Sequence, residues 1–292
     1  MGLFLFNMEK IRIALQSKGR LNLESVNLLK EAGAPVAESS RKFRSSSATF
    51  PLEAIYLRDD DISKAVAMGA ADLGIVGLNE VEERGGDVEV LYHLGFGRCR
   101  LSLAIPKEQE YTGLQYFNGK IVATSYPKIL ERFFAKHGVD ATIRTIAGSV
   151  EVTPSVGISD AIFDIVGSGL TLGENGLKEV EKILDSEALL IANRDLSSWK
   201  AKKITLLLSR FEAVRASKGR KYLMFNILTS KVGQVTEITP GMRGPTLFPL
   251  SREGWSSIHV VVEEEQLWSK IESLREIGAE GILVLSPEMV IP

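Results

Sequence analysis

Residues 157–172 read G-I-S-D-A-I-F-D-I-V-G-S-G-L-T-L, and the rest of the chain is organised around them. The first half of this stretch alternates apolar residues with Asp160 and Asp164, as a strand that is partly buried does. Buried carboxylates are costly unless they are paired or bound to something. The apolar positions that we expect to be buried are Ile158, Ala161, Ile162, Ile165 and Val166.

A loop of small residues follows this strand. It contains Gly167, Ser168, Gly169, Leu170 and Thr171, and it leads through Leu172 into a helical pattern over residues 175–187. Glycines let backbone N–H groups approach phosphate oxygens, and the first turn of a helix is partially positive. The loop therefore predicts an anion site, with an acid a few residues upstream for ribose hydroxyls or a metal-bound diphosphate. An ordinary strand-loop-helix turn with a capping hydroxyl is the alternative.

Length and composition exclude several classes of protein. The 292 residues allow two or three domains, and 45% apolar with 25% charged residues is typical of a globular protein. A net charge of −2 gives no electrostatic reason to expect a nucleic acid or an acidic membrane as partner. Cys99 is the single cysteine, and the three histidines are scattered. An internal disulfide is thereby excluded and a histidine zinc site disfavoured. With no signal peptide or membrane span in the pattern, we expect a cytoplasmic protein.

The N-terminal part predicts a strand, a polar loop and a helix. Residues 10–15 alternate as a strand, and Asn22 is expected to cap a helix that Gly33 ends. Lys18 and Arg20 then lie at a helix N-terminus beyond the carboxyl end of a strand, where open α/β sheets bind ligands. A solvated loop is the alternative for both.

Three consecutive acidic residues follow the strand expected at residues 53–58. Asp59, Asp60 and Asp61 come directly after it, and either Asp59 or Asp60 is expected to cap a helix over residues 62–69.

Repeated strand and helix signals continue from there and indicate two βαβ lobes around a cleft. The remaining expected elements of this region are strands at 72–77, 88–94, 119–123, 141–146 and 188–192 and helices at 128–137 and 199–214.

The last part of the chain changes character. Its expected order is strand, helix, two strands, helix and strand, which is the split ferredoxin-like unit. We expect lobe I at residues 1–100 and 186–215, lobe II at 101–185, and this unit at 216–292, as a regulatory or oligomerisation module. The expected elements are residues 221–228, 230–238, 245–250, 256–262, 264–277 and 281–285.

Taken together, these segments resemble the long form of ATP phosphoribosyltransferase, the first enzyme of histidine biosynthesis, over residues 11–291. Arg98 and Gly173 look like departures from the family pattern. The segments that carry the resemblance are R-I-A-L-Q-S-K-G-R (12–20), R-D-D-D-I (58–62), D-L-G-I-V-G (72–77), C-R-L-S-L-A (99–104), A-T-S-Y-P (123–127), G-S-V-E-V-T-P (148–154), D-A-I-F-D-I-V-G-S-G-L-T-L (160–172), E-N-G-L-K-E-V-E (174–181) and P-T-L-F-P-L (245–250).

The resemblance implies an α/β fold: a bilobal, periplasmic-binding-protein-like catalytic core plus a C-terminal ferredoxin-like (βαββαβ) regulatory domain. It implies a transferase that joins N1 of ATP to C1 of phosphoribosyl diphosphate and releases diphosphate, with Mg²⁺ as cofactor. It also implies feedback inhibition by histidine, with AMP as a further candidate inhibitor, and a homo-oligomer, a hexamer built from dimers. The metal ligands stay open.

Roles for individual residues follow from the same resemblance. The loop amides, with Ser168 and Thr171, would hold the 5-phosphate, and Asp164 and Asp160 would lie near the ribose. For Asp160, a structural carboxylate that binds backbone amides is the alternative. Lys18, Arg20 and Arg100 would neutralise phosphate charge. The residues expected to line the rest of the substrate cleft are Gln16, Gly19, Arg58, Asp59, Gly77, Tyr126, Glu151, Leu170 and Leu172.

Two other classes of protein fit part of the pattern. A bilobal solute-binding protein without catalysis would have two such lobes, but it would call for a secretion signal and has no need of the motif at residues 160–172. A ligand-sensing regulator would use the C-terminal module as sensor, but it would need a DNA-binding helical module or a basic patch.

Overall fold

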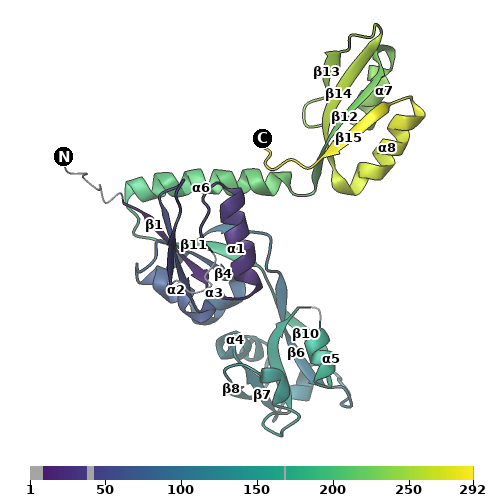
Figure 1. The fold of residues 1–292 in the computed structure, drawn as a ribbon. Coiled ribbons are helices and arrows are strands. Elements are labelled where there is room, and N and C mark those ends of the chain that lie inside the picture. The colour runs from purple at the N-terminus through teal and green to yellow at the C-terminus, as the bar shows by residue number, and fades with distance from the viewer. Residues whose placement is uncertain (1–8, 38–42, 168, 292) are drawn as a thin grey trace, which may run out of the picture. The chain divides into compact units, whose positions relative to one another are not determined.

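The computed structural model describes residues 9–37, 43–167 and 169–291. The chain divides into two compact units, one made of Met1–Lys30 with Ala34–Ala201 and the other of Glu31–Gly33 with Lys202–Pro292. Figure 1 shows two sheets in the first unit and a third sheet in the second.

The first sheet has six strands in the order β2-β3-β1-β4-β11-β5. Its central strand, β1, is parallel to β3 and β4, whereas β11 returns antiparallel between β4 and β5. The core strands are continuous apolar runs, with Ile13, Ile75 and Ile191 fully buried, as expected of strands covered on both faces. The elements are β1 (Ile11–Gln16), α1 (Arg20–Glu31), β2 (Arg44–Ser46), β3 (Leu52–Leu57), α2 (Asp59–Ala67), β4 (Leu73–Gly77), α3 (Leu78–Arg84), β5 (Val88–His93) and β11 (Ala188–Asn193).

The second sheet has five strands in the order β10-β6-β9-β7-β8. Phe117, Phe134 and Phe163 fill its main core, and Leu172 anchors the chain after the small-residue loop in a second cluster. Its elements are β6 (Cys99–Pro106), η1 (Leu114–Phe117), β7 (Ile121–Thr124), α4 (Pro127–His137), β8 (Thr142–Thr145), η2 (Val150–Val152), β9 (Ala161–Val166), α5 (Leu170–Glu174) and β10 (Leu177–Ser186).

The helix expected over residues 175–187 is wrong. The helix α5 ends at Glu174, and Leu177–Ser186 is the strand β10, paired antiparallel with β6. Lys, Glu and Leu favour a helix locally, but the pairing with β6 runs along the whole strand and overrides that preference. Two register shifts in the pairing interrupt the alternation that would have revealed a strand.

Several smaller expectations are also corrected. Asn22 lies inside α1 rather than at its cap, and its Nδ2 donates to the Gln16 carbonyl at 2.5 Å. The helix α2 already begins at Asp59, so its cap is Arg58 and the acids occupy the first turn without a side-chain cap. Two apolar residues that were expected to be buried are exposed, Ile158 by 39% and Ile165 by 43%.

The C-terminal unit is a four-stranded antiparallel sheet in the order β13-β14-β12-β15. With two helices in the βαββαβ sequence, this is the ferredoxin-like arrangement. Leu223, Phe225, Ile258 and Leu274 form its core. The elements are α6 (Ser198–Ser217), β12 (Arg220–Leu228), η3 (Thr229–Lys231), α7 (Val232–Ile238), β13 (Thr246–Pro249), β14 (Trp255–Glu263), η4 (Glu264–Gln266), α8 (Leu267–Glu276) and β15 (Glu280–Leu285). The helix α6 begins in the first unit and continues into the second.

Candidate active site

A cavity of about 330 Å³ within the first unit brings several of the expected residues together. The loop after β1, the β4–α3 junction, the chain leading into β6 and the end of β9 all contribute to it. Its lining residues are Gln16, Gly19, Arg20, Leu21, Asp59, Gly77, Asn79, Glu80, Gly97, Arg98, Cys99, Ile165 and Gly167.

The loop after β1 presents cations at the first turn of α1. Gly19 has a φ of +93°, a conformation that L side chains rarely adopt, and the turn places Arg20 as the first helical residue. The Arg20 side chain is mostly exposed, with Nε 3.0 Å from Oε1 of Glu24. An exposed pair of this kind contributes little to stability, so the guanidinium can exchange it for a phosphate. Lys18 is exposed beside it but does not line the cavity.

The loop after β9 turns sharply into α5. Gly169 is left-handed, with φ +80°, and its carbonyl accepts from the Gly173 N–H at 3.1 Å. Leu170 and Thr171 are exposed, whereas Leu172 is buried and anchors the turn. Ser168 lies outside the described residues. Because α5 has only five residues, an anion here would be held by loop amides more than by a helix dipole.

Asp164 is the carboxylate nearest to this loop along β9. Burial raises its pKa to about 6, and the negative charge of Glu151 acts in the same direction. The backbone N–H of Ile165, which donates to Oδ1 at 2.8 Å, opposes the shift. A carboxyl group poised near neutral pH is a candidate functional group. Asp164 itself does not line the cavity, to which its neighbour Ile165 contributes.

Asp160 lies at the opposite end of β9. Its Oδ2 accepts from the Ile121 N–H at 2.8 Å, and its own N–H donates to the Ile121 carbonyl at 2.8 Å. These bonds tie the starts of β7 and β9 together. The geometry favours the structural alternative for Asp160 over the ribose contact.

Arg100 is committed to protein partners. Its Nε and Nη2 lie 2.6 and 2.5 Å from the two carboxylate oxygens of Glu179, and Nη1 donates to the Gly167 carbonyl at 2.9 Å. The hydrogen bonds from Arg100 lower the pKa of Glu179. These contacts favour an indirect role for Arg100, through Gly167, while direct neutralisation of substrate phosphate stays a prediction.

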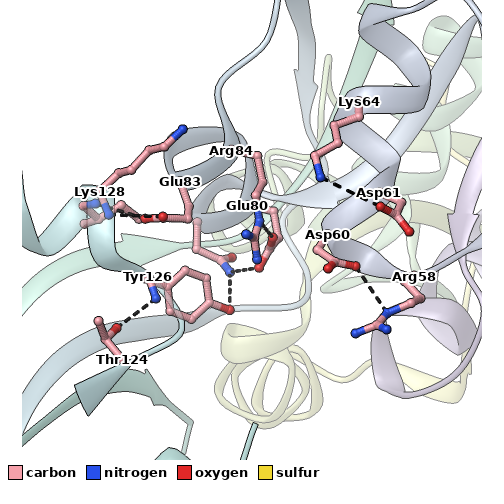
Figure 2. A network of polar contacts seen from close by, with 12 residues as sticks. Arg58, Asp60, Asp61, Lys64, Glu80, Glu83, Arg84, Thr124, Tyr126 and Lys128 are labelled. Carbon is pink, nitrogen blue, oxygen red and sulfur yellow. Dashed lines mark hydrogen bonds and ion pairs between the residues drawn. The ribbon is translucent and has the colours of Figure 1, made fainter. Parts of the chain in front are cut away.

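Figure 2 shows the polar network between α3 and the start of α4. Asn79 Nδ2 lies 3.2 Å from the Tyr126 hydroxyl, and Arg84 Nε lies 3.3 Å from Oε2 of Glu80. Glu80 is 4% exposed, and burial raises its pKa. Tyr126 does not line the cavity itself but contacts Asn79, which does.

Other expected site residues lie outside the cavity lining. Arg58 pairs with Asp60 at 3.4 Å, and Glu151 is in η2 after the left-handed Ser149. Conversely, the sequence reasoning missed Asn79 and Glu80. The available signal was the run Gly77-Leu78-Asn79-Glu80 directly after a buried strand, where open sheets bind ligands.

The two departures from the family pattern differ in position. Arg98 lines the cavity and adds a cation to it. Gly173 lies at the end of α5, where its carbonyl accepts from Lys107 Nζ at 2.9 Å.

Metal ligands are not preassembled in the part of the chain that the structure describes. Residues 9–37, 43–167 and 169–291 contain no group of three or more His, Cys, Asp or Glu side chains able to hold a metal ion. No helix in these same ranges is long and apolar enough to cross a membrane.

A cavity lined from both sheets of the first unit defines a bilobal α/β core, joined to a separate C-terminal sheet domain. A family model for ATP phosphoribosyltransferase (HisG) matches residues 58–213, and the model of the HisG C-terminal domain matches residues 217–288. The chain belongs to the ATP phosphoribosyltransferase family, in its long form, and is an enzyme of the first step of histidine biosynthesis.

Curated relatives agree with this assignment. The ATP phosphoribosyltransferases of Phocaeicola vulgatus and Bacteroides thetaiotaomicron are each 50% identical to the chain over 281 residues, which is 96% of this chain and 99% of the relative. Among solved structures, the ATP phosphoribosyl transferase (HisG:HisZ) complex from Thermotoga maritima is similar, with a TM-score of 0.60 and 25% identity over 69% of this chain and 96% of that chain. The solute-binding and regulator alternatives are thereby set aside.

Proposed function

We propose that the chain transfers the phosphoribosyl group of phosphoribosyl diphosphate to N1 of ATP. One observation carries the proposal: a single cavity is lined both by the loop after β1, with Gln16, Gly19 and Arg20, and by Gly167 at the start of the loop after β9. A nucleotide held by one loop would face a sugar phosphate held by the other. Such positioning converts a bimolecular step into an effectively unimolecular one.

The bond changes define what the residues must supply. The N1 lone pair of adenine forms the new bond to C1 with inversion, the C1–O bond breaks, and diphosphate leaves with the electron pair. Positive charge develops on the ribose ring and negative charge on the leaving group. The negative charge of Asp164 stabilises the positive charge on the ribose ring. Lys18 and Arg20 stabilise the negative charge on the diphosphate.

The remaining substrate contacts divide between the sugar-phosphate side and the nucleotide side of the cavity. The amides of Gly167 and Gly169 and the Thr171 hydroxyl hold the 5-phosphate, a role that the sequence motif extends to Ser168. Asp59 and Gly77 line the nucleotide side of the cavity with Asn79 and Glu80, which the structure adds.

Mg²⁺ is the proposed cofactor. This ion keeps several waters and is usually bound through one or two carboxylates and substrate phosphates. Asp164, a single carboxylate on β9 near the phosphate loop, would suit binding of that kind. When bound, the ion would supply charge neutralisation to the diphosphate.

We also propose that the C-terminal unit binds histidine and transmits feedback inhibition, that AMP is a second inhibitor, and that the chain works in the cytoplasm as a homo-oligomer, a hexamer built from dimers. A separately packed ferredoxin-like domain after the catalytic core supports a second site. Allostery in the strict sense requires such a site and two states of different affinity.

The test is to mix purified protein with ATP, phosphoribosyl diphosphate and Mg²⁺ and follow diphosphate release together with the mass of the nucleotide product. The expected product keeps all phosphates of ATP and gains one phosphoribosyl group. Diphosphate release with an unmodified nucleotide would mean hydrolysis and would refute the transfer to N1.

A further inference from the structure

We propose that Arg100 and Glu179 form a positioning pair that fixes the phosphate-binding loop after β9 through the Gly167 carbonyl. The proposal rests on the function proposed above for that loop. Arg100 is on β6 and Glu179 on β10, the two strands beside β9 on one side of the sheet. Neither is a catalytic residue, because each acts through the loop.

The geometry uses the fork of the guanidinium. Two of its nitrogens meet both oxygens of Glu179 at 2.6 and 2.5 Å, which holds the plane of the Arg100 side chain. The third nitrogen, Nη1, then points to the Gly167 carbonyl at 2.9 Å. Bidentate pairs of this kind are the strongest and most directional hydrogen bonds in proteins. Both side chains are about one-quarter to one-third exposed, so water competes only in part.

The bond to this carbonyl fixes the chain where it leaves β9 and enters the loop. Gly167 has no side chain with which to anchor itself, and nothing lies within 4 Å of where its Cβ would be. Arg100 therefore supplies the anchor at this point.

A third residue connects the pair to the candidate ribose carboxylate. Ser102 Oγ donates to Oε1 of Glu179 at 2.7 Å, and Ser102 is the register partner of Asp164 across β6 and β9. Ser102 therefore contacts Glu179 through its hydroxyl and lies opposite Asp164 through strand pairing, which links the pair to the strand that carries Asp164.

The competing role for Arg100 is a direct bond to phosphate, because three of the five guanidinium N–H groups are used and two are left. The two roles predict opposite effects of removing Glu179. If Arg100 binds phosphate itself, loss of Glu179 releases it and phosphoribosyl diphosphate binds as well as before or better. If Arg100 acts through Gly167, loss of Glu179 is as harmful as loss of Arg100.

The experiment compares Arg100→Lys, Glu179→Gln and the double variant in the full chain. The KM of phosphoribosyl diphosphate and its Kd by calorimetry should rise about tenfold in each single variant, as expected when a charge-assisted hydrogen bond that shapes a site is lost. Lysine keeps the charge but not the fork, so it should not rescue. The double variant should be no worse than either single variant, because the residues act as one unit. The KM of ATP should stay within about twofold, since the β1 loop is untouched.

Arg132→Lys is the matched control, because it makes the same change of residue type in an exposed ion pair with Glu82. It should leave every constant unchanged. If Glu179→Gln fails to fold, Ser102→Ala and Glu179→Asp weaken the same network more gently and should raise the same KM by a smaller factor.

Failure of this inference is distinguishable from failure of the loop's proposed role. Thr171→Ala tests the role itself: an unchanged KM for phosphoribosyl diphosphate in that variant would overturn it. If Thr171→Ala raises that KM while Glu179→Gln leaves it unchanged, or if the Arg100 and Glu179 effects are additive, the positioning pair is refuted and the loop role stands.

Discussion

At the scale of single residues, Asp164 carries the most specific expectation. Its carboxylate is largely shielded from water on β9, close to the proposed phosphate loop. Asp164→Asn keeps the size of the side chain but removes the negative charge that would stabilise the developing oxocarbenium ion. We expect turnover to fall about 100-fold, as when one electrostatic stabiliser is removed from an active site. Steady-state kinetics at saturating substrates measures this effect, and turnover within about twofold of the wild type would contradict it.

The same carboxyl predicts a pH dependence of stability. Its folded pKa, about 6, is raised above the ordinary value of 3.8, so folding disfavours the ionised form. Its favourable contribution is fully present below the unfolded pKa and is lost as the pH rises through the folded pKa. The Tm of Asp164→Asn minus the Tm of the wild type should therefore increase as the pH is raised from 4 to about 7. Thermal melts across this range test the sign; a Tm difference that shrinks with rising pH would contradict it.

The cations of the β1 loop give a prediction about substrate binding. Arg20 is mostly exposed and bonded only to Glu24 among the contacts of the described residues. Arg20→Ala and Lys18→Ala should raise substrate KM values about tenfold each with little change in Tm, because charge-assisted contacts to phosphate are lost while the fold is not. Lys30→Ala, which removes an exposed cation from the last turn of the same helix, is the control and should leave KM unchanged. Unchanged KM values in the two variants would show that Lys18 and Arg20 are ordinary solvated loop residues.

At the scale of elements, α4 depends on a side chain from α3. The cap residue of α4, Tyr126, makes no side-chain cap bond, and Pro127 has no N–H to satisfy. The two oxygens of Glu83 instead accept from the N–H groups of Lys128 at 3.1 Å and Ile129 at 3.0 Å. Figure 2 shows Glu83 reaching the start of that helix.

Glu83→Ala should therefore destabilise the first unit. Glu83 is 2% exposed, so its loss leaves two N–H groups without partners in a buried place, at a cost of about 2 kcal/mol. Urea denaturation measures the change. Its neighbour Glu82 pairs with Arg132 on an exposed surface, so Glu82→Ala should cost under about 0.5 kcal/mol. Equal effects of the two substitutions would show that the cap is not what stabilises α4.

At the scale of the whole molecule, the C-terminal unit gives the remaining prediction. It has its own core of Leu223, Phe225 and Ile258. A chain that ends after Arg215 should lose histidine inhibition while it keeps transferase activity, if the regulatory site lies in the ferredoxin-like unit. The measurement is an inhibition curve with histidine for both chains. Because α6 continues to Ser217, a second truncation after Ser217 controls for damage to that helix. Inhibition that survives both truncations would contradict the assignment.

Much of the architecture could be predicted because local signals agreed with it. Buried strands such as Leu73–Gly77 are apolar runs, and the Gly138 C-cap, with φ +65°, ends α4 as its sequence indicates. The strand Leu177–Ser186 could not be predicted, because its residues favour a helix and only the pairing with β6 makes it a strand.

The sequence by itself determined the class of fold, the family and the small-residue loop, since these depend on residue types in order along the chain. Tertiary structure alone decided which charges are available. Arg100 and Asp160 are both candidate ligands in the sequence, yet one is held by Glu179 and Gly167 and the other by Ile121. Partners 39 to 79 residues away in sequence are set by strand pairing, and strand pairing is not visible in a local pattern.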